Sequence, residues 1–226
     1  MTHRFVDTHC HFDFPPFTGD EEQSIAKAAE AGVQAIIVPA VEAAYFSRVL
    51  DLSARHPALY AALGLHPIVI ERHRDEHLEE LDRVLQRAGE KLVAIGEIGL
   101  DYYWKGNEPK DVQKRRLLEQ LDLAKQFDLP VIIHDRDAHG DILEIFQKEV
   151  TGVRAVFHCY SGSLEMAKEL LKRGFYLGFG GTSTYKNAAK VREVLQYVPD
   201  DLLLFETDSP YLTPVPYRGK RNQPGY

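Results

Sequence analysis

The sequence predicts a single α/β domain over residues 1–226, a (β/α)8 barrel of the TIM type. Strand-like apolar runs alternate with amphipathic helical patterns along the whole chain, and eight such runs occur. This alternation indicates a parallel sheet with helical crossovers, and eight strands favour closure into a barrel. No change in composition and no Ser/Gly-rich linker divides the chain, which supports one domain.

Each predicted strand is an apolar or β-branched run. The strands cover residues 4–12, 34–40, 59–66, 92–100, 130–135, 155–160, 176–181 and 202–208. Amphipathic helices are predicted at residues 20–31, 76–88, 109–127 and 163–173. The best marked helix is the third of these, because Pro109 suits a first helical turn and Leu117, Leu121 and Ala124 form an apolar face.

No helical pattern follows the eighth strand. The chain continues through Pro214 and Pro216 to Tyr226, and although Pro224 would suit the start of a helix, only two residues follow it. We therefore expect the eighth helix to be missing and an apolar groove to be exposed between the first and seventh helices. A monomer is the expected state, but such a groove would predict poor solubility or dimerisation.

The composition is that of an ordinary globular protein, with 44% hydrophobic and 27% charged residues. The net charge of -7 excludes an overall basic field that draws in nucleic acid, but an enzyme that carries cations in its site needs no basic surface. No apolar run is long enough to span a bilayer, the N-terminus lacks an export signal, and Cys10 and Cys159 do not suggest a disulfide framework. We expect a cytoplasmic protein without membrane association.

The strongest chemical signal is the segment Asp7-Thr8-His9-Cys10-His11 in the first predicted strand. Alternate residues of a strand face the same side, so His9 and His11 should point together, with Asp7 on the same face. Two imidazoles that converge in this way can share a cation. The alternative is a pair of core histidines with satisfied hydrogen bonds.

Further candidate ligands lie late in later strands, where active sites of this fold are built. With the first pair they make a predicted metal-binding set of His9, His11, Glu97, His134, His158 and Asp208. Burial of so many ionisable groups without a cation would be costly. Six ligands suit two divalent ions, bridged best by Glu97, and Asp208 could also accept a proton from the attacking water. The imidazoles and carboxylates together admit Zn²⁺, Mn²⁺, Fe²⁺ or Co²⁺, and Mg²⁺ less naturally.

Five motifs together resemble the successive signatures of the TatD family, metal-dependent nucleases of the amidohydrolase-like barrel superfamily. These motifs are DTHCHFD (7–13), GLHP (64–67), GEIGLD (96–101), HCYSG (158–162) and ETDSPYL (206–212). The resemblance covers essentially the whole chain and implies a cytoplasmic deoxyribonuclease that digests DNA from the 3′ end and prefers single strands. It supports the same six ligands and implies magnesium as activator, so Mg²⁺, Mn²⁺ and Zn²⁺ all stay open. The family normally continues past Pro224 into a closing helix.

Three residues are candidates for substrate binding. His66 could donate to a phosphate, Arg136 could clamp one, and Tyr160 could contact a base or sugar. The alternatives are a turn histidine, an exposed surface arginine and a loop tyrosine. The aromatic run 102–104 is either a stacking platform for nucleobases or an anchor for its own loop.

The leading hypothesis is a metal-dependent exonuclease with single-stranded DNA as substrate. The enzyme alternative is an amidohydrolase-type activity on a small ester, lactone or phosphoester, because the same ions and water could attack carbon or phosphorus. Relatives of that kind commonly use a carboxylated lysine as the bridge, and Glu97 argues against them. The alternative of another class is a non-catalytic, metal-stabilised or nucleic-acid-binding module.

Overall fold

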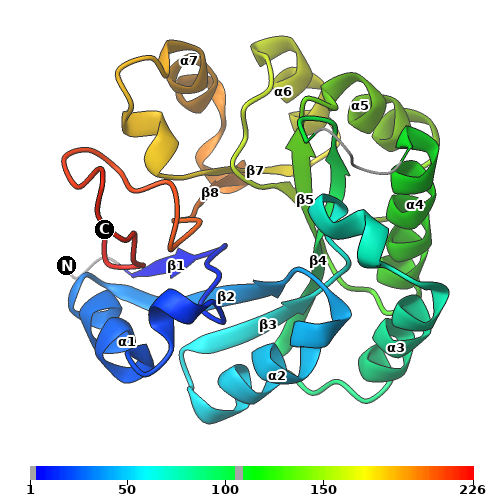
Figure 1. Ribbon diagram of the computed structural model, residues 1–226. Helices are drawn as coiled ribbons and strands as arrows, with labels where there is room; N and C mark the ends of the chain where they lie inside the picture. The colour runs from blue at the N-terminus through cyan, green and yellow to red at the C-terminus, as the bar shows by residue number, and fades with distance from the viewer. Residues whose placement is uncertain (1–3, 105–108) are drawn as a thin grey trace.

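The computed structural model describes residues 4–104 and 109–226. Eight parallel strands follow one another in chain order in a single sheet, and the helices surround it, which confirms the predicted (β/α)8 barrel (Figure 1). The strands are β1 (Phe5–Asp7), β2 (Val33–Ala40), β3 (Leu59–Leu63), β4 (Leu92–Asp101), β5 (Val131–Arg136), β6 (Ala155–Phe157), β7 (Tyr176–Phe179) and β8 (Leu203–Phe205).

Seven α-helices alternate with the strands in the described ranges. They are α1 (Glu21–Glu30), α2 (Phe46–Arg55), α3 (Asp75–Leu85), α4 (Lys110–Gln126), α5 (His139–Lys148), α6 (Leu164–Leu171) and α7 (Ala189–Tyr197). Short 3-10 helices lie at Pro15–Phe17, Ala43–Tyr45, Pro67–Arg72, Gly181–Thr184 and Asp200–Leu202. The four predicted helices are present as α1, α3, α4 and α6, with ends that differ by one to three residues. No helix within residues 4–104 and 109–226 is long and apolar enough to cross a membrane.

Five strands are shorter than predicted, β3 and β7 by two or three residues and three others by three or more. The runs 4–12, 155–160 and 202–208 each give only three residues of regular strand, because the chain then leaves the regular ladder and turns into the rim. The first run nevertheless stays extended at Cys10, which forms a parallel bridge with Ser209 and whose N–H donates to the carbonyl of Ile37 at 3.0 Å. The predicted alternation of side chains therefore survives beyond the end of β1.

Backbone hydrogen bonds between the two ends of the sheet close the barrel. The Thr8 N–H donates to the carbonyl of Phe205 at 3.1 Å, and the Asp208 N–H donates to the carbonyl of His9 at 2.9 Å. These bonds lie at the end of β8 and just past the ends of β1 and β8, and we call this junction the seam. The seam therefore brings the first and last predicted ligands together.

The chain after β8 contains no helix among the described residues, as predicted. It crosses instead to α1, where Arg221 forms an ion pair with Asp20 at 2.7 Å (Figure 1). The outer face of β1 and β8 stays partly uncovered, since Phe5, Val6 and Phe205 are 43%, 47% and 53% exposed. These three residues line a groove that also includes Ala31 after α1 and Thr184 before α7, but no residue of α7 itself. Its effect on solubility or assembly stays a prediction.

Two buried glutamines of α4 hold the carboxyl ends of β3 and β4. The side chain of Gln120 accepts from the Leu65 N–H at 2.7 Å and donates to the Leu65 carbonyl at 3.2 Å. Seven residues earlier, Gln113 makes the same pair of bonds with the backbone of Asp101, at 2.9 and 3.0 Å. Because both ends lie at the rim, α4 fixes the backbone from which site residues project.

We predict that Gln120→Leu lowers the free energy of unfolding by about 2 kcal/mol, because each buried backbone group left unpaired costs about 1–3 kcal/mol. Urea denaturation would measure this loss. The control is Gln126→Leu, at an exposed position of the same helix, for which a change within about 0.5 kcal/mol is expected. Equal effects of the two substitutions would contradict the anchoring role of Gln120.

An ion pair at the start of α5 should make stability depend on pH. His139 Nδ1 lies 2.7 Å from Asp135 Oδ2, and this hydrogen bond raises the pKa of His139 above its usual 6.5. The stabilisation is fully present below the unfolded-state pKa and is lost as pH rises through the higher folded-state pKa. We therefore predict that the difference in melting temperature between wild type and His139→Gln is largest below about pH 6 and shrinks as pH rises above the usual histidine range. A constant difference would contradict this linkage.

Candidate metal centre

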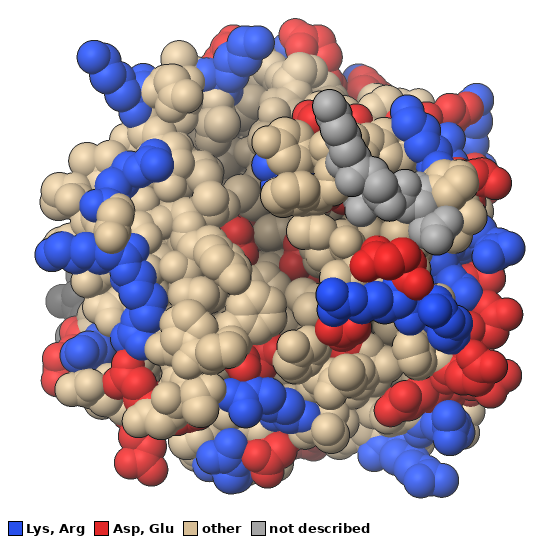
Figure 2. Space-filling model, in the orientation of Figure 1, with Lys and Arg blue, Asp and Glu red and all other residues tan. Residues whose placement is uncertain are grey.

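The predicted ligands gather at the carboxyl ends of the strands, around the axis of the barrel. Figure 2 shows this face hollowed at its centre, with acidic side chains at the floor of the hollow and mostly uncharged residues around it. The set comprises His9 and His11 beyond β1, Glu97 in β4, His134 in β5, His158 beyond β6 and Asp208 beyond β8, joined by His66 beyond β3. The most exposed are His134 and Asp208, whose side chains are each 16% exposed.

Glu97 lies between two groups of ligands. Its Oε2 is 3.3 Å from His9 Nε2 and 3.6 Å from His11 Nε2. Its Oε1 is 2.7 Å from His158 Nε2 and 2.8 Å from His134 Nδ1. One buried carboxylate thus presents each oxygen to a different set of imidazoles, which is the arrangement of a bridging ligand.

The first group, named the A site, consists of His9, His11, Asp208 and the Oε2 of Glu97. The Nε2 atoms of His9 and His11 are 3.3 Å apart, and Asp208 Oδ1 lies 3.8 and 3.5 Å from them. Two ring nitrogens so close need a proton or a cation between them, because two lone pairs facing each other would repel. Two imidazoles and two carboxylates fit a divalent ion such as Zn²⁺ or Mn²⁺.

The second group, named the B site, consists of His134 Nδ1, His158 Nε2 and the Oε1 of Glu97. The other nitrogen of His134, Nε2, lies 2.9 Å from Asp101 Oδ2. A histidine that donates one N–H to a carboxylate has its tautomer and ring orientation fixed, with the other nitrogen left for a metal. The donor set of the B site therefore also fits a cation.

The electrostatics differ among the members of the cluster. Burial opposes protonation of His134 and His158, but Asp101 and Glu97 raise the pKa of His134, and Glu97 and Glu206 raise that of His158. Burial and the neighbouring His9 lower the pKa of His11 to about 3, so this imidazole is neutral and able to bind a metal at pH 7. Burial opposes ionisation of Glu97, but the surrounding histidines, His66 first, hold its pKa well below the usual range. Burial raises the pKa of Asp208 to about 6.

His66 is oriented as a hydrogen-bond donor. Its Nδ1 accepts from the Ile68 N–H at 2.9 Å, and its Nε2 lies 3.0 Å from Glu97 Oε1. Burial lowers the pKa of His66, so the neutral ring carries its proton on Nε2. This tautomer favours donation to a carboxylate or a phosphate over coordination of a metal through the same atom.

The other two predicted substrate residues lie in different surroundings. The guanidinium of Arg136 lies 3.8 Å from the ring centroid of Tyr103 and 5.7 Å from that of Trp104, and both rings are about half exposed on the rim. Tyr160 is buried, and its hydroxyl donates to the carbonyl of Ser163 at 2.7 Å. Substrate contact by Arg136 and Tyr160 stays a prediction.

Sequence reasoning missed three residues that hold the ligands in place. Asp101 orients His134, and its signal was only the acidic end of the GEIGLD motif. Glu206, a charge directly after an apolar run, lies beside His158. Asn222 is buried and donates to the carbonyls of Thr207 and Tyr211 at 2.7 and 2.6 Å, which fixes the loop of Asp208. No local sequence signal marks Asn222, because its partners lie 11 and 15 residues away.

Comparison with known proteins identifies the family of the chain. The family model for TatD related DNase matches residues 6–226. The chain is 48% identical to the metal-dependent hydrolase YjjV of Escherichia coli (strain K12), over 99% of this chain and 86% of the relative. It is 42% identical to the metal-dependent hydrolase YabD of Bacillus subtilis (strain 168), over 97% of this chain and 86% of the relative.

Solved structures of other proteins have the same fold. The crystal structure of the E. coli protein YjjV, a TatD homologue, superposes with a TM-score of 0.94 at 47% identity, over all of this chain and 86% of that one. A phosphotriesterase homology protein of E. coli shares the fold at a TM-score of 0.64 and 14% identity, over 92% of this chain and 83% of that one. The resemblance carried by the sequence motifs is thereby confirmed, and the chain belongs to the TatD family of metal-dependent hydrolases.

Proposed function

We propose that the protein is a two-metal deoxyribonuclease that removes nucleotides from the 3′ end of DNA and prefers single strands. The proposal rests on the position of the Glu97 carboxylate, whose Oε2 faces the A site and whose Oε1 faces the B site. The distances from these oxygens to the histidine nitrogens are 2.7–3.6 Å. This position supports two divalent cations bridged by one carboxylate, the arrangement that many phosphodiester-cleaving enzymes use.

The residues of the chain have separate roles in this proposal. The residues that would hold the cations are His9, His11, Glu97, His134, His158 and Asp208, and the four imidazoles among them would favour Mn²⁺ or Zn²⁺ over Mg²⁺. When bound, divalent cations polarise the phosphodiester and activate a water molecule. Asp208, ionised at pH 7, accepts the proton of that water, and His66 Nε2 donates a hydrogen bond to a phosphate oxygen.

The rim supports contact with an unpaired end of DNA. Few cations surround the hollow, and the net charge is -7, so a long duplex has no basic track to follow (Figure 2). Arg136 stacked on Tyr103, beside Trp104, offers one charge for a phosphate and exposed rings for bases. Base faces are free to stack only where they are unpaired, which supports the preference for single strands.

A second aromatic group lies beside the A site. The ring of Phe14 stacks on His11 at a centroid distance of 4.6 Å and meets Tyr211 edge-on at 6.2 Å. Tyr211 is 56% exposed. The reactive centre therefore has exposed aromatic surface near the A site as well as at Arg136, which supports binding of nucleotides close to the scissile bond.

The uncharged rim also favours a second candidate, hydrolysis of a small ester, lactone or phosphoester. Such a substrate needs no basic surface, and the same cations and water could attack carbon. For either activity we expect a monomer in the cytoplasm, where the free thiols of Cys10 and Cys159 would stay reduced.

We predict that Asp208→Asn lowers the rate of DNA digestion by about 100- to 10,000-fold, because an amide cannot accept the proton of the water. End-labelled single-stranded DNA and protein resupplied with Mn²⁺ or Mg²⁺ after chelation would measure it. Glu97→Ala should abolish the metal-dependent ladder, and Glu193→Ala, at an exposed position of α7, should leave it unchanged. No digestion by folded wild-type protein, together with turnover of small esters, would favour the second candidate.

We also predict that divalent cations stabilise the fold. Free Mn²⁺ or Zn²⁺ at about 100 times its dissociation constant should add about 2.7 kcal/mol, which raises the melting temperature by about 5–10 °C. Differential scanning calorimetry of chelated and resupplied protein would measure this shift. Glu97→Ala removes the shared ligand of both sites and should lose most of the shift. A shift of wild-type size in Glu97→Ala would argue against bridging by Glu97.

A further inference from the structure

Glu206 is a buried carboxylate that belongs to neither ion site. It is only 6% exposed, and it follows β8 two residues before Asp208. Its Oε1 accepts from the Cys159 N–H at 2.5 Å and lies 3.4 Å from His158 Nδ1. Its Oε2 is also buried and has no hydrogen-bond partner in the part of the chain that the structure describes. Half of its hydrogen-bonding capacity is therefore unused.

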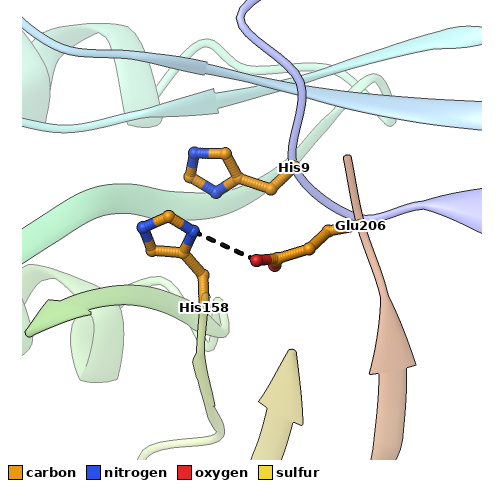
Figure 3. A group of neighbouring side chains, drawn as sticks. All are labelled: His9, His158 and Glu206. Atoms are coloured by element: carbon orange, nitrogen blue, oxygen red, sulfur yellow. Dashed lines mark ion pairs between the residues drawn. The ribbon is translucent and has the colours of Figure 1, made fainter. Parts of the chain in front are cut away.

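Two histidines, one from each ion site, face this carboxylate. The rings of His9 and His158 are stacked, with centroids 3.9 Å apart and planes 10° from parallel. Figure 3 shows Glu206 on the side of one nitrogen of each ring, while the other nitrogen points away. Ligand atoms of the three side chains lie within 4.8 Å of one another. The Nδ1 atoms of both rings are buried and lack a hydrogen-bond partner within the described residues.

The neighbouring strand β7 is shaped to hold Glu206 in this place. A Cβ added to Gly178 would lie 2.5 Å from Glu206 Oε2, and one added to Gly180 would lie 2.9 Å from the Glu206 carbonyl. Both approaches are closer than real Cβ contacts allow. The space for the carboxylate therefore exists because these two positions carry no side chain.

We propose that Glu206 is a positioning residue shared by the two ion sites. It accepts the Nδ1–H of His158 and of His9, and this fixes both rings in the tautomer that leaves Nε2 for the B and A ions. The inference rests on the two-ion site proposed above. A carboxylate behind a metal-binding imidazole commonly has this role, but here one carboxylate serves a ligand of each ion.

A third cation between Glu206 and the two Nδ1 atoms is the alternative occupant. It would require both imidazoles to bind metal through both nitrogens, with each ring deprotonated. With a proton on each Nδ1, both rings can donate a hydrogen bond to Glu206 without being deprotonated, because neutral histidine carries one N–H. The chemistry of the group thus favours a shared hydrogen-bond acceptor.

The test is titration of metal-free protein with Mn²⁺ or Zn²⁺ in a calorimeter. Wild type is expected to bind two ions per chain, and Glu206→Ala is expected to weaken both by about 10- to 100-fold. Gly178→Ala displaces the carboxylate without removing it and should also lower the binding affinity for both ions. Glu193→Ala, the same chemical change at the exposed site on α7, should bind as wild type does.

The possible outcomes separate this inference from the proposed function. Wild type that binds fewer than two ions overturns the two-ion site and the inference with it. Two ions bound with wild-type affinity by both Glu206→Ala and Gly178→Ala overturn the inference alone. Weakening of one ion only overturns the shared role, and a third ion in wild type identifies Glu206 as a ligand instead.

A spectroscopic measurement reports on the tautomers directly. Long-range ¹H–¹⁵N NMR of ion-loaded wild type should place the proton of His9 and His158 on Nδ1, and Glu206→Ala should broaden or shift these signals. Protons absent from both Nδ1 atoms in wild type would overturn the proposal. Thermal melting of the metal-free variants checks folding, and Glu206→Gln, which keeps an acceptor oxygen and the side-chain volume, takes the place of the alanine variant if that one does not fold.

Discussion

The burial of the Glu97 carboxylate is the constraint on which the rest of the site depends. Glu97 is 3% exposed, and four imidazoles place a nitrogen within 3.3 Å of its two oxygens. A charge taken out of water in this way is tolerated only where neighbours or cations compensate it. Burial opposes protonation of His134 and His158, but the carboxylates beside them raise both pKa values, so these imidazoles compensate the charge of Glu97 when no cation is bound. A bound cation would take over this role. Metal binding would therefore also stabilise the centre of the barrel.

Backbone hydrogen bonds, rather than flexible loops, hold the residues of the site in position. The proposed ligands come from five strands or the residues just after them, and the hydrogen bond from the Asp208 N–H to the His9 carbonyl holds the first and last of these strands together. On the opposite side, Gln113 and Gln120 of α4 fix the backbone at Asp101 and Leu65. Gly99 lets β4 approach β5, because a Cβ there would lie 1.9 Å from the His134 carbonyl. The positions of the ligands are consequently set by the fold itself.

This explains which features the sequence predicts and which it does not. The alternation of apolar runs and amphipathic helices predicts the barrel, and the abrupt polar ends of the runs predict Glu97, His134 and His158, because a parallel barrel brings all such ends to one rim. The lengths of β1, β6 and β8 could not be predicted, since the extent of pairing with neighbouring strands depends on three-dimensional register. The contact between Glu206 and His158 likewise joins residues 48 positions apart, and only the folded barrel brings them together.

In the two-ion site proposed above, the cations would have an electrostatic role as well as a chemical one. The chain carries a net charge of -7, and acidic side chains lie at the floor of the hollow. Two divalent ions would bring four positive charges against Glu97 and Asp208 and would reverse the local field. Arg136, stacked on Tyr103 at the rim, then adds a fixed charge at the entrance. If the proposed function holds, an acidic protein would bind its anionic substrate mainly at the end that reaches the metals. The exposed aromatic rings of Tyr103 and Trp104 at the rim are consistent with such a local contact.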